Sequence, residues 1–407
     1  MSGPGPRLTR RALLRAGGAL TLSALGGGSL PGCSPRRDPL DSGPYLQRVS
    51  TDRAVVGAIT RGPERLVLRW GPRGAAALDQ VSEEPEATSF HRLEAHGLLP
   101  GGEYTYRLER ASGQLVGEAT FRAAPAPGGA ATFAVLGDSG GTERSRGALI
   151  DELDELQAEA RGRLDDENQQ ARVASAVLAR PGADLVLHTG DVVYPDGALE
   201  DYPQAFFGPF AALVAGRPVV PAVGNHDIKA AGGGAFAGVF LDPGEGPLPD
   251  GRARSFEWGD VHFTLLDVVG SAFQPGSAQA AWAEEDLLAS PLPWKVAVFH
   301  VPPIVGHKPG EYEEVMADLI PLLQRAGVQL ALCGHDHIYA RWFPLGGVTC
   351  VTTGGGGKSL YSILPDPRLA YGESVFHFLE VAVTPRSLEL RGIDAAGRVF
   401  DHTRLER

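Results

Sequence analysis

Five apolar runs in the later part of the chain each end in a short loop that begins with side chains able to bind a metal. The loops read LGDSGG, TGDVVY, VGNHD, VFHVPP and CGHDH, and they contain Asp138, Asp191, Asn225 with His226, His300, and His335 with His337. An apolar run of this kind predicts a buried strand, and catalytic side chains often lie in the loop that follows one. Because strands alternate with helices in this region, we expect an α/β layered fold that presents these residues from rigid strand ends.

The chemistry of the set is more specific than any one member. A single histidine at a strand end is more often a hydrogen-bonded structural residue than a ligand. Two carboxylates, an amide oxygen and three imidazoles together suit a pair of hard or borderline metal ions. Two metals about 3.5–4 Å apart can hold the attacking and leaving oxygens of a phosphoryl transfer. One carboxylate must bridge such a pair, and Asp191, in the middle of the set, is the candidate.

The chain of 407 residues is long enough for two domains. Short alternating runs separated by turns rich in Gly, Pro and Asp predict an all-β sandwich over residues 44–124. Its GLLPGGEYTYRL segment resembles the corresponding segment of fibronectin type III-like domains. A Pro/Gly/Ala-rich linker is expected over 125–131, followed by the α/β domain over 132–407, with helices across roughly 146–180 and over 311–326.

Composition limits the partners of the protein. The apolar fraction of 43% fits a soluble globular chain, and the formal net charge of −12 makes nucleic acid and anionic lipid surfaces poor partners. An anionic substrate must therefore be held by local positive charge, for which a metal centre is a source.

Residues 1–33 predict a targeting segment, followed by a linker over 34–43. A basic start, the pair Arg10 and Arg11 and a weakly apolar run resemble a twin-arginine export signal. Such a signal would place the folded protein in the periplasm, outside the cell or at the membrane. The sequence Leu-Pro-Gly-Cys that ends at Cys33 is similar to a lipoprotein cleavage box, so Cys33 is a candidate site for a lipid anchor. Cleavage without lipidation and an uncleaved anchor remain alternatives.

Two cysteines remain after Cys33. Cys333 and Cys350 fall on neighbouring predicted strands, where they could pair in an oxidising compartment. We expect two small buried thiols instead, because a core of this size needs no cross-link. The spacing of the cysteines does not predict a Cys-based zinc site.

The ligand set resembles that of the calcineurin-like metallophosphoesterases, and among them the purple acid phosphatases. Most of that superfamily has Asp-x-His in the first loop, whereas this chain has Asp138, Ser139 and Gly140. The purple acid phosphatases share this departure and use the tyrosine of a GDxxY motif, which is Tyr194 here. The resemblance implies an α/β four-layer sandwich behind the fibronectin type III-like domain.

The resemblance also implies roles for individual residues. Asp138, Tyr194 and His337 would bind Fe(3+), and Asp191 would bridge the two metals. A divalent partner (Fe2+, Zn2+ or Mn2+) would be held by Asn225, His300 and His335. The catalytic residues would be Asp191 and His226, which contacts the phosphate and assists the leaving group. His307, in PPIVGHKPG, would bind substrate, and Arg341 would form a structural ion pair.

The activity implied by the resemblance is hydrolysis of small phosphate monoesters by a metal-bound hydroxide, as in an acid phosphatase. Two alternatives stay open at this point. One is a metallophosphodiesterase of the same superfamily, and the other is a non-catalytic, surface-anchored binding protein with a vestigial metal centre. The sequence does not give the natural substrate or the oligomeric state.

Overall fold

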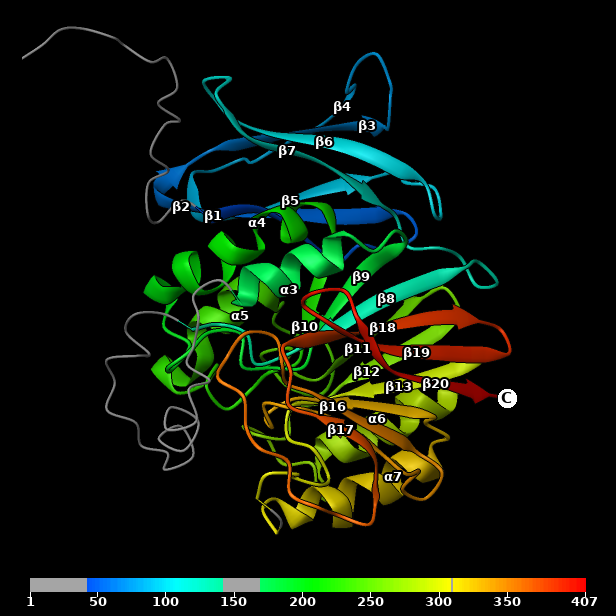
Figure 1. Cartoon of the computed structure of the whole chain (residues 1–407). Coiled ribbons are helices and arrows are strands. Elements are labelled where there is room, and N and C mark those ends of the chain that lie inside the picture. The colour runs from blue at the N-terminus through cyan, green and yellow to red at the C-terminus, as the bar shows by residue number, and fades with distance from the viewer. Residues whose placement is uncertain (1–41, 142–168, 309) are drawn as a thin grey trace, which may run out of the picture. The chain divides into compact units, whose positions relative to one another are not determined.

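The structure, a computed structural model, describes residues 42–141, 169–308 and 310–407 (Figure 1). The predicted export segment with Cys33, and most of the helix predicted across 146–180, lie outside these residues. All described residues belong to the compact unit Asp38–Arg407. Within them, no helix has the length and apolar character needed to cross a membrane.

The N-terminal part is a β-sandwich of two antiparallel sheets, as the sequence predicts. One sheet has the order β1-β2-β5 and the other β4-β3-β6-β7. The strands are β1 (Ser42–Gln47), β2 (Arg53–Glu64), β3 (Leu66–Pro72), β4 (Gln80–Glu83), β5 (Thr88–His96), β6 (Glu103–Arg110) and β7 (Leu115–Arg122).

Two of these strands are not visible as alternating runs in the sequence. β1 starts at Ser42, inside the linker expected over 34–43, and it contains Gly43 and Pro44. Proline is tolerated there because β1 is an edge strand, where one backbone N–H needs no partner. β4, the edge of the other sheet, is polar and largely exposed, so it has no apolar alternation to detect.

The C-terminal part is built on two mixed sheets. The six-stranded sheet has the order β10-β9-β8-β18-β19-β20, and the seven-stranded sheet has the order β11-β12-β13-β14-β16-β15-β17. The first consists of β8 (Ala131–Leu136), β9 (Ala183–His188), β10 (Val219–Pro221), β18 (His377–Thr384), β19 (Ser387–Asp394) and β20 (Val399–Glu406). The second consists of β11 (Arg254–Trp258), β12 (Val261–Leu265), β13 (Trp294–Val298), β14 (Leu330–Cys333), β15 (Tyr339–Trp342), β16 (Thr349–Thr353) and β17 (Leu369–Glu373).

Helices cover the outer faces of both sheets, which gives the four layers that the resemblance implies (Figure 1). α3 (Gln169–Leu178), α4 (Gly208–Gly216) and α5 (Gly234–Phe240) pack on the six-stranded sheet. α6 (Ala278–Ala289) and α7 (Ile320–Arg325) pack on the other. Single helical turns occur at Leu199–Asp201, Pro203–Phe207, Ala230–Gly233 and Val315–Leu319.

The alternation of side chains along the strands produces this layering. Phe133 of β8 points between the sheets, where its ring meets that of Phe263 edge-on at 5.1 Å, while the next residue, Ala134, packs in the outer cluster with the helices. Cys333 and Cys350 are buried free thiols in the layer between the seven-stranded sheet and its helices.

The helix predicted over 311–326 is present and begins at Glu313, directly after Tyr312, whose left-handed backbone with φ 54° cannot continue a right-handed helix. It runs through Val315–Leu319 into α7, which ends at Arg325.

Candidate metal centre

Three of the predicted ligands lie immediately beyond strands in an unusual backbone conformation. Asp138 follows β8, Asp191 follows β9 and His335 follows β14, and their φ angles are 57°, 55° and 67°. Left-handed backbone is uncommon for residues with a side chain, and it occurs preferentially at functional sites. β8 and β9 are parallel neighbours, as are β13 and β14, so their carboxyl ends deliver these loops to a common edge of each sheet.

Tyr194 lies at the centre of a first group of donors. Its hydroxyl oxygen is 3.2 Å from Asp138 Oδ1, 2.9 Å from Asp191 Oδ2 and 2.9 Å from His337 Nε2. A phenol has one proton, so it can donate to only one of these three atoms. The side chain is buried, and the tyrosine is not merely a packing residue.

Asn225 lies at the centre of a second group. Its Oδ1 is 3.0 Å from His300 Nε2 and 3.1 Å from His335 Nδ1. Asp191 joins the two groups, because its Oδ2 contacts both the Tyr194 hydroxyl and, at 3.3 Å, His300 Nε2. Donor atoms of Asp191, His300 and His335 all lie within 4.8 Å of one another, close enough to hold one metal ion.

Backbone carbonyls fix the orientation of two imidazoles. His300 Nδ1 lies 2.9 Å from the carbonyl oxygen of Thr189, and His337 Nδ1 lies 2.7 Å from that of Ser359. A carbonyl can only accept, so Nδ1 carries the proton in both residues. Nε2 therefore faces the centre in both residues, and it would offer its lone pair to a bound metal ion, as in metal-binding histidines.

The electrostatics of the cluster call for a cation. Burial, together with Asp191 and Asp138, raises the pKa of Tyr194 well above its usual range. Burial opposes protonation of His300, yet the Asp191 carboxylate raises its pKa to about 9. Burial also raises the pKa of Asp138, against the hydrogen bond from His337. Protons are therefore held between these groups where a metal ion would otherwise supply the positive charge.

Glycines leave space for the candidate ligands to lie this close together. A Cβ on Gly224 would lie 2.2 Å from Asp191 Oδ1, and a Cβ on Gly334 would lie 2.6 Å from Asp138 Oδ2. Any larger residue would displace a candidate ligand. The types of donor atom fit a pair of metal ions, and the glycines leave the space in which these donors can converge.

His226 lies beside the cluster and is not one of its converging donors. Its backbone N–H donates to Asp191 Oδ1 at 2.8 Å, and its ring Nδ1 lies 2.5 Å from the Pro195 carbonyl oxygen. Nδ1 thus carries a proton, and this hydrogen bond fixes the orientation of the ring. Lys229 Nζ is 3.2 Å from both ring nitrogens, which adds positive charge next to this histidine.

The structure shows two residues near the centre that the sequence reasoning did not single out. Asp227 is fully buried and accepts hydrogen bonds from the backbone N–H groups of both the Asp191 and the Asn225 loops. Lys358 is 3% exposed, and its ammonium lies 5.3 Å from the centre of the Tyr194 ring. Asp227 could have been noticed because it closes the VGNHD loop after an apolar run. Lys358 could have been noticed because it directly follows the run of four glycines.

The other predicted residues lie around the cluster. His307 Nδ1 is 2.5 Å from Asp336 Oδ1, and its ring packs on Tyr361. The Tyr361 ring also stacks on the His337 ring, with 4.2 Å between the ring centres. His307 therefore lies near the centre, and its role in substrate binding stays a prediction. Arg341 forms a two-pronged ion pair with Asp401 at 2.7 and 2.9 Å, which links β15 to β20.

Comparison with known proteins gives a family match. The profile of the calcineurin-like phosphoesterase family matches residues 131–339, just over half of the chain. "Probable inactive purple acid phosphatase 27" of Arabidopsis thaliana is 27% identical over 288 residues, which cover 63% of this chain and 44% of the relative. "Nucleotide pyrophosphatase/phosphodiesterase" of Hordeum vulgare is 27% identical over 285 residues, which cover 60% of this chain and 73% of the relative. The chain thus spans less than half the length of the Arabidopsis relative.

Two solved structures share the fold. The purple acid phosphatase PPD1 from yellow lupin (Lupinus luteus) seeds has a TM-score of 0.72 at 20% identity, over 89% of this chain and 74% of that chain. PhoD has a TM-score of 0.65 at 15% identity, over 93% of this chain and 90% of that chain. At these identities the likeness concerns the fold alone. From the extent of the profile match, together with this fold, the chain belongs to the calcineurin-like phosphoesterase family and resembles, among its members, the purple acid phosphatases.

Proposed function

We propose that the protein is an exported phosphatase that hydrolyses small phosphate monoesters at a pair of metal ions. Asp138, Tyr194 and His337 would hold Fe(3+), and Asn225, His300 and His335 would hold a divalent ion (Fe2+, Zn2+ or Mn2+). Asp191 would be shared by the two ions. The observation that supports this best is the Tyr194 hydroxyl, which lies within 3.2 Å of Asp138, Asp191 and His337 in a loop set that lacks the usual histidine at Gly140.

The side chains around the pair perform the remaining steps. When bound, the two metals supply an activated water and neutralise charge on the phosphate oxygens. His226 is held by the hydrogen bond from Nδ1 to the Pro195 carbonyl, so that a ring that is also protonated at Nε2 would transfer the Nε2 proton to the departing alcohol oxygen and become neutral. Lys229, beside the same ring, adds a positive charge that would attract the phosphate. Asp227 holds the Asp191 loop and the Asn225 loop together, because its carboxylate accepts a backbone hydrogen bond from each.

A second candidate is a phosphodiesterase of the same fold. It is favoured by the barley relative, whose name is "Nucleotide pyrophosphatase/phosphodiesterase". Turnover of 4-nitrophenyl phosphate against bis(4-nitrophenyl) phosphate by the metal-loaded full chain separates the two, and we expect the monoester to react faster. A binding protein with a vestigial centre is the third reading, because several relatives are named inactive. The complete ligand set of this chain argues against it, and zero turnover with both metals bound would support it.

The ferric assignment is tested by Tyr194→Phe, which keeps the ring and removes one oxygen. A phenolate bound to Fe(3+) gives the wild type a broad visible charge-transfer band, because the acidic metal displaces the phenol proton. We expect the variant to lose the band even with iron bound, as measured by absorption spectroscopy and metal analysis on the same samples.

Tyr202→Phe is the matched control. Tyr202 is also fully buried, and its hydroxyl has no hydrogen-bond partner among the described residues, so its loss should leave the band unchanged. A colourless wild type with one ferric iron per chain would refute the assignment. So would a Tyr194→Phe variant that keeps its colour.

A further inference from the structure

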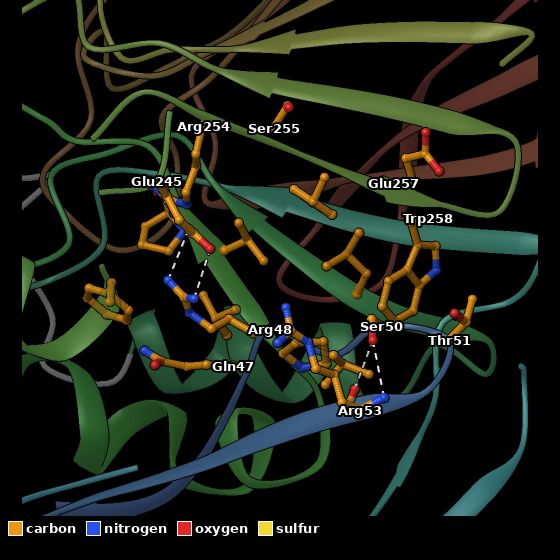
Figure 2. A pocket seen from close by; sticks show the side chains of 18 residues that line it. Gln47, Arg48, Ser50, Thr51, Arg53, Glu245, Arg254, Ser255, Glu257 and Trp258 are labelled. Atoms are coloured by element: carbon orange, nitrogen blue, oxygen red, sulfur yellow. Dashed lines mark hydrogen bonds and ion pairs between the residues drawn. The ribbon is translucent and has the colours of Figure 1, made fainter. Parts of the chain in front are cut away.

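A pocket of about 370 Å³ lies between the β-sandwich and the edges of the two phosphoesterase sheets (Figure 2). Its walls come from the segment between β1 and β2, from β10, and from β11 with the residue Glu245 before it. None of the candidate metal ligands lines it. The volume falls within the range of roughly 300–1,000 Å³ in which proteins bind small organic molecules.

Arg254 is the unusual feature of this pocket. Its side chain is buried, with the residue 8% exposed, and its guanidinium donates only to the carbonyl oxygens of Pro221, at 2.8 Å, and Gly251, at 3.4 Å. Within the described ranges it forms no ion pair. Carbonyl oxygens satisfy hydrogen bonds but do not neutralise a charge, so the pocket contains a buried and uncompensated positive charge.

The neighbouring acids are already paired. Arg48 binds both carboxylate oxygens of Glu245, at 2.9 and 3.0 Å, and also pairs with Asp242, which is shared with Arg92. Figure 2 shows the Arg48–Glu245 pair next to Arg254. The remaining lining acid, Glu257, has a side chain that is 57% exposed, so water screens its charge.

Half of the residues that line the pocket are apolar. Trp258 lies at the side of the pocket away from the Arg48–Glu245 pair (Figure 2). The apolar lining side chains include Val49, Leu185, Val219, Phe240, Phe256 and Trp258. A ligand of this pocket therefore needs one anionic end and one apolar, ring-sized body.

We propose that the pocket binds a small organic monocarboxylate, whose carboxylate pairs with the Arg254 guanidinium and whose apolar body packs toward Trp258. Of the three lining arginines, Arg48 is paired with Glu245 and Arg53 is exposed to water, so Arg254 is the buried one that a single negative charge would match. A guanidinium pairs with a carboxylate through two parallel hydrogen bonds. An inorganic phosphate ion is a poorer fit, since it has no apolar body to place against the apolar part of the wall.

The experiment measures phenylacetate binding to the folded full chain by isothermal titration calorimetry, with phenylacetamide as the neutral isostere. We expect saturable one-site binding of phenylacetate, with phenylacetamide and the Arg254→Met variant each about 10- to 100-fold weaker, the range for a lost charge-assisted hydrogen bond. Arg217→Met is the matched control, because Arg217 also donates only to backbone carbonyls yet lies outside the pocket.

If circular dichroism shows that Arg254→Met does not fold, Thr51→Trp replaces it, since an indole on this partly exposed lining loop should fill the pocket and abolish binding. The proposal is overturned if the wild type shows no saturable phenylacetate binding, or if folded Arg254→Met or Thr51→Trp binds as tightly as the wild type. Arg254-dependent binding of inorganic phosphate without phenylacetate binding would overturn the ligand class.

Discussion

Asp227 should be as important to the stability of the centre as the ligands themselves. Its Oδ2 accepts from the backbone N–H groups of Asp191 and Gly224, both at 2.9 Å, and its Oδ1 accepts from Val192 at 2.9 Å and Val193 at 3.4 Å. The carboxylate thereby ties the loop after β9 to the loop after β10. Every neighbour is a donor, so the site needs an acceptor at both oxygen positions.

Asp227→Asn keeps the shape but supplies only one oxygen. Whichever way the amide turns, its NH2 group faces two buried backbone N–H groups, each of which loses its acceptor. A buried donor without a partner costs about 1–3 kcal/mol, so we expect the free energy of unfolding to fall by roughly 2–6 kcal/mol. Because the displaced loops hold Asp191 and Asn225, metal affinity should also fall, by about 10- to 100-fold.

The assay is urea unfolding followed by circular dichroism, together with metal titration. Burial and the charge of Asp191 raise the pKa of Asp227 to about 7, so measurements at about pH 8 keep the carboxylate ionised. Asp267→Asn is the control, since Asp267 is also fully buried and accepts from Val269, Gly270 and Ser271 without contact to a candidate ligand. It should lose stability and keep metal affinity. An Asp227→Asn protein within about 0.5 kcal/mol of the wild type would refute the reasoning.

Three further predictions concern catalysis, pH and export. His226→Ala should keep both metals and lose about 10²–10⁴ in kcat, with a smaller loss for nitrophenol esters; an equal loss for all leaving groups would contradict a proton-transfer role. Burial opposes ionisation of Asp401, yet Arg341 and Tyr339 hold its pKa below its usual range. The Arg341–Asp401 pair should therefore stabilise the fold above the ordinary carboxyl pKa of about 3.9, and this stabilisation should be lost as the pH falls through the lower folded-state pKa. Asp401→Asn should lower the free energy of unfolding by roughly 1–3 kcal/mol at neutral pH and by less in strong acid, as measured by unfolding across pH. Replacing Arg10 and Arg11 by Lys should retain the protein in the cytoplasm, and Cys33→Ser should release a soluble form, both followed by cell fractionation; a Cys33→Ser protein that stays with the membrane would rule out the lipid anchor.

The fold class that the sequence predicted is confirmed, and the candidate ligands it named stay predictions; both were inferred from local patterns. An apolar run followed by a polar ligand in a glycine-rich loop is visible one segment at a time, as around Asp138 and Asp191. The missing histidine at Gly140 and the tyrosine at Tyr194 were also visible locally, because each lies within a short motif. β1 and β4 could not be detected as alternating runs, because β4 is polar and largely exposed and β1 begins with Gly43 and Pro44 inside a linker-like stretch.

The tertiary structure decided which residues surround the ligands and which charges stay unpaired. Asp227 acts through backbone N–H groups that are 34 to 36 residues away, and no sequence pattern records which donors a buried carboxylate will meet. The unpaired charge of Arg254 is equally non-local. Arg254 has no acidic partner because Glu245 and Asp242 are paired with Arg48 and Arg92, which lie far away in the sequence. The identity of a ligand can thus be local, whereas the compensation of a buried charge is a property of the packed chain.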